Sequence, residues 1–248
     1  MRIAVCGKGG SGKSTIAGAL ARHLARRGHK VVAVDADPNP NLGISLGVAR
    51  ETVEDMRPIL NALLDAGHTH DDPTPLAEDL LARYGVDAPE GIRLVATGKI
   101  ERPTDACLCC GSHNTTRQFF GELTADDGVV VADLEAGLND LIWARPGPQD
   151  VVLAVSEGSE KSVEIARRAV AVARELGVTR VIGVANRSVS EADAERLAQQ
   201  LDVAETFRVP EDPAVEHADG LGVAPMDADP ASPAMAAVGR LADLVVTP

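Results

Sequence analysis

A glycine-rich stretch near the amino terminus constrains this chain most strongly. Residues 7–15 read Gly-Lys-Gly-Gly-Ser-Gly-Lys-Ser-Thr and fit the pattern G-x-x-x-x-G-K-[ST] of a phosphate-binding loop. An apolar run at residues 3–5 precedes the loop, and an apolar stripe at helical spacing follows it at Ile16, Ala17, Leu20 and Leu24. Strand, glycine loop and helix in this order predict that the chain binds a nucleotide through its phosphates.

Each part of the loop has a chemical role in that prediction. Glycines let the backbone fold tightly and turn its N–H groups toward an anion at a helix N-terminus. Lys13 would reach the β- and γ-phosphates, and the Ser14 hydroxyl would ligate Mg²⁺. The loop residues predicted to bind the nucleotide are Gly9, Gly10, Ser11, Gly12, Lys13, Ser14 and Thr15.

A second lysine makes the loop more specific. Lys8 gives the sequence Lys-Gly-Gly-x-Gly-Lys-Ser, which resembles the deviant Walker A loop of a family of ATPases. That family includes the MinD and ParA partition ATPases, the nitrogenase iron protein and the nickel-insertion ATPases of carbon monoxide dehydrogenase. Its extra lysine crosses a two-fold interface to contact the partner subunit's nucleotide. The resemblance implies that Lys8 acts with Lys13 in catalysis and that the chain is an ATP-dependent homodimer. A solvated loop lysine is the alternative.

Composition limits the other classes of function. The 248 residues carry 24 Lys and Arg against 37 Asp and Glu, a net charge of −13, which disfavours a nucleic-acid partner because phosphate contacts need clustered cations. No apolar run reaches the 18 residues expected of a membrane span, and the phosphate loop stands where a signal peptide would lie. We therefore expect a cytoplasmic protein without nucleic-acid or membrane partners.

Alternating apolar runs and helical patterns predict the fold class. Wholly apolar runs at residues 31–34, 129–132 and 151–155 are typical of strands buried on both faces of a parallel sheet, and residues 92–95 and 181–185 add two more strands. Helical patterns lie between them. We expect an α/β fold, a doubly wound and mostly parallel sheet with helices on both faces, as one P-loop domain over residues 1–248. The segment at about 45–90 is poorly readable and contains short helices.

Acidic residues follow two of the predicted strands, at the edge where open α/β sheets bind ligands. Asp35 and Asp133 are placed to hold Mg²⁺, and Asp133 fits the Walker B role. In the resembled family, the 24 positions from Lys13 to Asp37 are the spacing of an aspartate that activates the attacking water. Gly137 completes a D-x-x-x-G switch pattern, and its N–H would meet the γ-phosphate. The alternative for Asp35 and Asp37 is a pair of turn or helix caps.

Two later segments are predicted to recognise the base. Asn186 follows the strand at 181–185, and an asparagine there reads the adenine edge in the resembled family. A guanine site would place an aspartate three residues later, where this chain has Val189, so the sequence favours ATP over GTP. Residues 208–212, with Pro210 and Glu211, resemble the second loop on the base side.

A cysteine cluster is the other feature that needs an explanation. Cys107, Cys109 and Cys110 lie within four positions, too few and too close for a four-cysteine zinc site in one chain. In a two-fold dimer, Cys107 and Cys109 of both copies would supply four thiolates to one metal on the axis. Four sulfurs suit tetrahedral Zn²⁺ or an Fe–S cluster, and Ni²⁺ prefers a square plane. Small reduced cysteines without a metal are the alternative, and Cys6 is expected in the core.

The C-x-C pair, together with the loop and both acidic segments, resembles the CooC-type nickel-insertion ATPases. This resemblance implies a dimeric metallochaperone that couples ATP hydrolysis to insertion of a metal, nickel or zinc, into a client such as carbon monoxide dehydrogenase. Cys110 departs from the two-cysteine pattern, and His113 is a possible substitute ligand. Two other readings remain: an Fe–S carrier or electron-transfer ATPase, and a partition or positioning ATPase of the MinD/ParA type.

Overall fold

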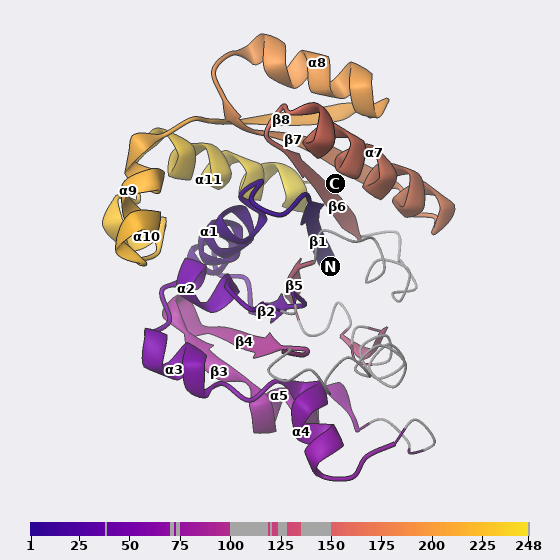
Figure 1. The fold of residues 1–248 in the computed structure, drawn as a ribbon, viewed down its shortest axis with the longest axis vertical. Helices are drawn as coiled ribbons and strands as arrows, with labels where there is room; N and C mark the ends of the chain where they lie inside the picture. Colours follow the sequence, from indigo (N-terminus) through magenta and orange to yellow (C-terminus); the bar gives the residue numbers. More distant parts are fainter. Residues whose placement is uncertain are drawn as a thin grey trace.

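The apolar runs assemble into one sheet, which forms the middle layer of the molecule (Figure 1). A computed structural model describes residues 1–37, 39–69, 72, 75–99, 119, 121–123, 128–134 and 150–247. Within these residues eight strands pair in the order β3-β4-β2-β5-β1-β6-β7-β8. Their bounds are β1 Arg2–Gly7, β2 Val31–Asp35, β3 Val86–Ala88, β4 Ile92–Ala96, β5 Val129–Asp133, β6 Val151–Ser156, β7 Arg180–Ser188 and β8 Glu205–Pro210. The pairs are parallel except for β3 with β4, as predicted for a mostly parallel sheet.

Helices cover both faces of this sheet (Figure 1). Helices α1 and α11 pack on one face, and α7, α8 and the shorter α4 and α5 pack on the other. The helix bounds are α1 Lys13–Arg26, α2 Leu42–Leu46, α3 Arg50–Asp55, α4 Ile59–Asp65, α5 Ala77–Tyr84, α7 Glu160–Glu175, α8 Glu191–Leu201, α9 Pro213–Leu221, α10 Pro225–Ala228 and α11 Pro233–Val246, with a 3₁₀ turn, η1, at Pro89–Gly91. The predicted fold class is therefore confirmed.

The side chains of β1 alternate between the two hydrophobic clusters that lie on opposite faces of the sheet. Ile3 and Val5 are fully buried in the cluster beneath α1, while Cys6 belongs to the cluster on the opposite face. Successive side chains of a strand point to opposite faces, so a central strand must be apolar throughout. Cys6 donates its thiol to the Leu153 carbonyl at 3.4 Å, and burial raises its pKa to about 12, which confirms the expected core role.

Strand order creates the crevice that the site uses. β1 lies between β5 and β6, and the helix that follows β1 covers the opposite face from the helix that follows β6. Two connections that leave the sheet in opposite directions open a gap at the carboxyl ends of these strands. The glycine loop lies at this gap, at the end of β1.

At the edges of the sheet, the structure corrects one sequence expectation and adds one strand that the sequence did not predict. Residues 205–210 form β8, an edge strand paired with β7, so residues 208–210 of the segment predicted as a base-side loop are strand. β3 adds an antiparallel edge of three residues beside β4. Both edge strands are only partly buried, so they lack the continuous apolar run that marked the central strands.

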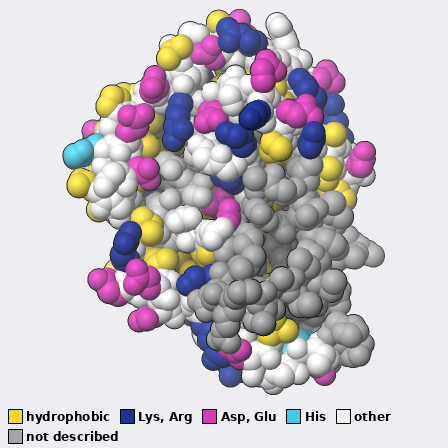
Figure 2. Space-filling model, in the orientation of Figure 1, with side chains coloured by type: hydrophobic (Ala, Val, Ile, Leu, Met, Phe, Trp, Pro, Cys, Tyr) yellow, Lys and Arg dark blue, Asp and Glu magenta, His cyan; other side chains and the backbone are white. Residues whose placement is uncertain are grey.

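Two further observations concern the charges on one face of the molecule and the character of its helices. On the face drawn in Figure 2, Lys and Arg side chains lie interspersed with Asp and Glu over the upper part of the molecule, rather than gathered into one patch. None of the helices in the described ranges is long and apolar enough to cross a membrane.

Candidate functional site

The glycine loop joins β1 to α1, and two of its glycines stand where a side chain would not fit. A Cβ on Gly7 would lie 2.3 Å from the Val155 carbonyl oxygen, and a Cβ on Gly12 would lie 2.3 Å from the Asn186 amide nitrogen. Gly12 also has φ near +89°, in the left-handed region that favours glycine. The loop backbone therefore lies directly against the ends of β6 and β7.

The amino end of α1 is open to an anion. No side chain caps this fully described helix, and its first turn holds no acidic residue, so its first N–H groups and the positive end of the helix dipole stay available. Lys13, the first residue of α1, is only 6% exposed. The next residue, Ser14, hydrogen-bonds through its side chain to the Asp133 carboxyl. The loop thus combines backbone donors, a shielded cation and a hydroxyl, as phosphate binding requires.

Two carboxyl groups meet beside the loop at the ends of neighbouring strands. Asp35 ends β2 and Asp133 ends β5, and the parallel register pairs these two residues. Both are at most 1% exposed. Burial and the Asp133 charge raise the pKa of Asp35 to about 7, and burial, with a smaller contribution from Asp37, raises the pKa of Asp133 to about 6. Two buried carboxylates this close are unfavourable without a cation.

The hydrogen bonds of this pair show which oxygen is available to a metal. Asp35 accepts the backbone N–H groups of Leu42 at 2.8 Å and Asp37 at 3.2 Å, so it caps α2 and shapes the loop after β2. Asp133 Oδ1 is buried and has no hydrogen-bond partner among the described residues. An orphaned carboxylate oxygen next to the Ser14 hydroxyl fits a hard, oxygen-preferring ion such as Mg²⁺.

Asp37, the predicted catalytic residue, lies in the loop between β2 and α2. It is partly buried, and its Oδ1 accepts the Asn39 N–H at 2.8 Å. This is the turn role that the sequence left open, and Asp35 likewise acts as a helix cap. The turn role and the predicted catalytic role of Asp37 are compatible, because a carboxylate oxygen that accepts a loop N–H without nucleotide can contact water once nucleotide is bound. The role of Asp37 in activating water therefore stays a prediction.

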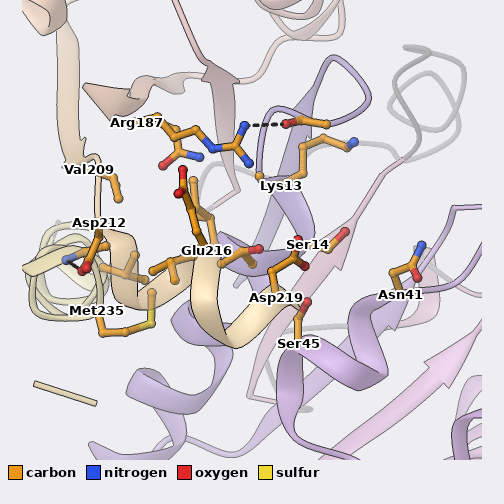
Figure 3. A pocket seen from close by; sticks show the side chains of 18 of the residues that line it. Lys13, Ser14, Asn41, Ser45, Arg187, Val209, Asp212, Glu216, Asp219 and Met235 are labelled. Atoms are coloured by element: carbon orange, nitrogen blue, oxygen red, sulfur yellow. Dashed lines mark hydrogen bonds between the residues drawn. The ribbon is translucent and has the colours of Figure 1, made fainter. Parts of the chain in front are cut away.

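A cleft of about 460 Å³ extends from the glycine loop along α9 (Figure 3). Asn186 lines it and donates its amide to the Ser11 carbonyl at 2.8 Å, so the predicted base-reading residue also ties β7 to the loop. Pro210 and Glu211 also line the cleft, and the Glu211 N–H donates to the Ser188 carbonyl at 3.2 Å. The structure therefore brings the predicted base-side residues and the phosphate loop to one cleft.

Several residues of the cleft were missed by the sequence reasoning. Arg187 follows Asn186 with φ near +52° and donates to the Gly10 carbonyl at 3.3 Å, and Figure 3 shows it at the loop end of the cleft. α9 contributes Glu216 and Asp219, and α11 contributes Met235. Asp212 holds α9 and α11 together by accepting the N–H groups of Ala214 and Ala234. No motif marks Arg187, Glu216, Asp219 or Met235. Asp212 lies in the segment 208–212 that was predicted to recognise the base, and the Asp-Pro at 212–213 signals a helix start.

Comparison with known protein families identifies the class. The sequence model of the CobQ/CobB/MinD/ParA nucleotide binding domain matches residues 3–219. The chain belongs to this family. Its fold and its phosphate loop are therefore those of a MinD/ParA-type P-loop protein, and the family resemblance seen in the loop is confirmed. The chain is an ATPase, as predicted, and ATP with Mg²⁺ fits the loop and carboxylates described above.

Curated relatives in this family are similar over most of the chain. The carbon monoxide dehydrogenase accessory protein CooC of Rhodospirillum rubrum is 31% identical over 242 residues, which cover 93% of this chain and 91% of that protein. An uncharacterised ATP-binding protein of Methanocaldococcus jannaschii is 33% identical over 203 residues, which cover 79% of this chain and 78% of that protein.

Solved structures of MinD/ParA proteins share the fold. The septum site-determining protein MinD of Pyrococcus horikoshii, complexed with Mg-ADP, superimposes with a TM-score of 0.73 at 20% identity, covering 99% of this chain and 96% of that chain. A ParA family ATPase from Chlorobium tepidum gives a TM-score of 0.74 at 17% identity, covering 97% of this chain and 96% of that chain.

Part of the predicted site of this MinD/ParA-type chain lies outside the described residues. This holds for Gly137 in the switch segment and for the cysteine cluster with its possible extra ligand, which comprises Cys107, Cys109, Cys110 and His113. Across the described ranges, no group of three or more His, Cys, Asp or Glu side chains is arranged to hold a metal. The transition-metal site therefore stays a prediction.

Proposed function

We propose that this chain is an ATP-dependent dimeric metallochaperone that inserts a metal, nickel by preference, into a client enzyme such as a carbon monoxide dehydrogenase. The observation that carries the proposal is the 31% identity to the carbon monoxide dehydrogenase accessory protein CooC, which extends over 91% of that protein's length. Similarity confined to the nucleotide site would be shared by any ATPase of the family. Similarity along nearly the whole chain supports a shared task as well.

The nucleotide-binding part of the proposal rests on residues with described contacts. Lys13 and the open end of α1 would hold the phosphates, and Ser14 with Asp133 would ligate Mg²⁺, while Asp35 would hold it through water. The ion would neutralise charge that develops on the phosphates during transfer. Asp37 would orient the attacking water, and we expect slow turnover because a delivery switch gains nothing from fast hydrolysis. Residues 1–248 would act as one domain.

The dimerisation part of the proposal rests on Lys8. This lysine would reach the nucleotide of a second copy and draw two chains together around two ATP molecules. We expect Lys8→Ala to abolish ATP-dependent dimerisation and to change the melting temperature of the monomer little, because the side chain is part of no core cluster and its ion pair with Glu157 is partly exposed. Light scattering with and without a non-hydrolysable ATP analogue measures this. A dimer that survives the substitution contradicts the model.

The metal-binding part of the proposal rests on Cys107 and Cys109. Two copies supply four thiolates, enough to hold one soft ion on the dimer axis. The switch segment at Gly137 would report the state of the γ-phosphate and reshape the cysteine segment that precedes it in the chain. Hydrolysis would then release the metal to the client. The cytoplasm is the compartment that suits reduced thiolates.

Metal stoichiometry under anaerobic, reducing conditions tests this function directly. The purified chain is offered Ni²⁺, Zn²⁺, or Fe with sulfide, with and without ATP, and bound metal is counted per dimer. The variant Cys107→Ser/Cys109→Ser removes the proposed ligands. Cys6→Ala is the matched control, because it deletes a thiol that is buried in β1 and whose pKa of about 12 keeps it protonated and inert.

The results of that experiment distinguish the metallochaperone from the other candidate functions. One nickel or zinc ion per dimer, lost with Cys107 and Cys109 but kept in the Cys6 variant, supports metal delivery. Iron–sulfur absorption would move the function to an Fe–S carrier. A chain that binds no metal in any nucleotide state would refute the metallochaperone and leave an ATPase of the MinD/ParA family.

A further inference from the structure

Three charged side chains from three segments meet beside the glycine loop. Lys8 Nζ lies 3.1 Å from Glu157 Oε1, and Arg187 Nη1 lies 3.6 Å from Glu157 Oε2. The Lys8 side chain is 36% exposed and that of Glu157 is 22% exposed. Lys8 and Glu157 are 149 positions apart, so only the neighbouring places of β1 and β6 in the sheet bring them together. We call this group the loop charge cluster.

Glu157 is held in place from several directions. Its N–H donates to the Ser162 hydroxyl at 3.2 Å, and its Oε1 also accepts the Ser159 hydroxyl at 3.3 Å. Ser159 is the N-cap of α7. The carboxylate therefore stays where it is when one partner leaves, and it acts as a fixed acceptor at the side of the loop.

We propose that Glu157 is a positioning residue that keeps Lys8 on its own chain until a nucleotide-loaded second copy is present. This inference rests on the proposed function, in which Lys8 reaches the partner's nucleotide. A lysine is a flexible point charge, so it can leave the carboxylate without distorting the loop. Glu157 would therefore set how much nucleotide is needed before two copies associate.

The remaining members of the loop charge cluster make this release inexpensive. When Lys8 leaves, Glu157 Oε2 keeps Arg187 and Oε1 keeps Ser159, so no carboxylate oxygen is orphaned. Arg187 in turn stays anchored on the Gly10 carbonyl. The polyphosphate of a nucleotide carries several negative charges against the single charge of Glu157, so it wins the competition for Lys8 once it is close enough.

Amine labelling of the nucleotide-free chain tests the contact without needing a dimer. A brief pulse of an amine-reactive ester, followed by digestion and mass spectrometry, gives the labelling rate of Lys8 relative to that of the exposed Lys30. We expect Glu157→Gln to raise the relative rate roughly two- to fivefold, as befits a partly exposed ion pair. Glu160→Gln is the matched control, because it removes an exposed carboxylate from the same turn and leaves the loop charge cluster intact.

A dimer titration tests the consequence. Sedimentation velocity with a non-hydrolysable ATP analogue gives the dimer dissociation constant of the wild type and of both variants. We expect Glu157→Gln to tighten the dimer by roughly two- to fivefold at low salt, and by less at high salt, where the pair is screened. Glu160→Gln should match the wild type.

The two readouts separate this inference from the proposed function. Equal labelling of Lys8 in the wild type and in Glu157→Gln overturns the inference, and so does a Glu157→Gln dimer that is no tighter than the wild type. A wild-type chain that remains monomeric with the analogue, while the labelling still differs, overturns the proposed dimer and leaves the Lys8–Glu157 contact supported.

Discussion

Replacing Asp133 by asparagine should raise the free energy of unfolding and weaken the response of the chain to Mg-ATP. The wild-type carboxyl is buried at the end of β5, and its pKa is about 6 in place of the usual 3.8. Between these two values the folded chain holds a proton that the unfolded chain has released. Stability therefore falls as the pH rises through this window, and above pH 6 the full penalty is present. The amide stays neutral at every pH and resembles the protonated acid in shape.

The size of the effect follows from the pKa difference. A shift of about two pKa units corresponds to roughly 3 kcal/mol, since each unit is worth about 1.4 kcal/mol. We expect Asp133→Asn to raise the free energy of unfolding by up to about 3 kcal/mol at pH 8 without Mg²⁺, and to change it little near pH 4. Removing this charge also relieves Asp35, whose pKa is raised to about 7 partly by Asp133.

Urea denaturation in EDTA at several pH values measures this difference, and Mg-ATP provides the opposite test. The wild type should gain stability from Mg-ATP, and Asp133→Asn should gain much less, because an Mg²⁺ ligand is lost. Asp55→Asn is the matched control, since Asp55 is exposed at the end of α3. If the Asp133 variant were no more stable than the wild type at pH 8, or kept the same pH slope, the reasoning about a destabilising buried charge would be refuted.

Two further predictions concern the loop. Gly12→Ala should weaken ATP binding by roughly tenfold or more in calorimetry, because the new Cβ would lie 2.3 Å from the Asn186 amide at a residue with φ near +89°. Gly9→Ala is the control and should keep the wild-type melting temperature, because its Cβ would meet nothing within 4 Å. A Gly12→Ala variant that binds ATP as tightly as the wild type would contradict the prediction. Asn186→Ala removes the bond to the Ser11 carbonyl and should weaken ATP binding by roughly fivefold, about 1 kcal/mol; an unchanged affinity would show that this tie does not shape the site.

Local pattern was enough to predict the centre of the fold and the chemistry of the loop. The strand, glycine loop and helix at residues 3–24 are contiguous, so sterics and helix periodicity alone indicate them. The central strands are buried on both faces and therefore appear as unbroken apolar runs. The position of Asp35 and Asp133 at strand ends could be predicted in the same way. Their adjacency could not, because the order of parallel strands depends on contacts between distant segments.

Tertiary structure decided how the site is assembled. It placed β2 beside β5, so that the carboxyl groups of Asp35 and Asp133 lie next to each other in a buried site. It also brought Asn186 into hydrogen-bond contact with Ser11, 175 residues away in the sequence. It also set Glu157 against Lys8, a contact that no spacing in the sequence indicates. The amino acids by themselves determined that a phosphate would be bound and by which loop. Which side chains surround that loop depended on strand order, since the free energy of a parallel sheet lies in long-range pairing and burial.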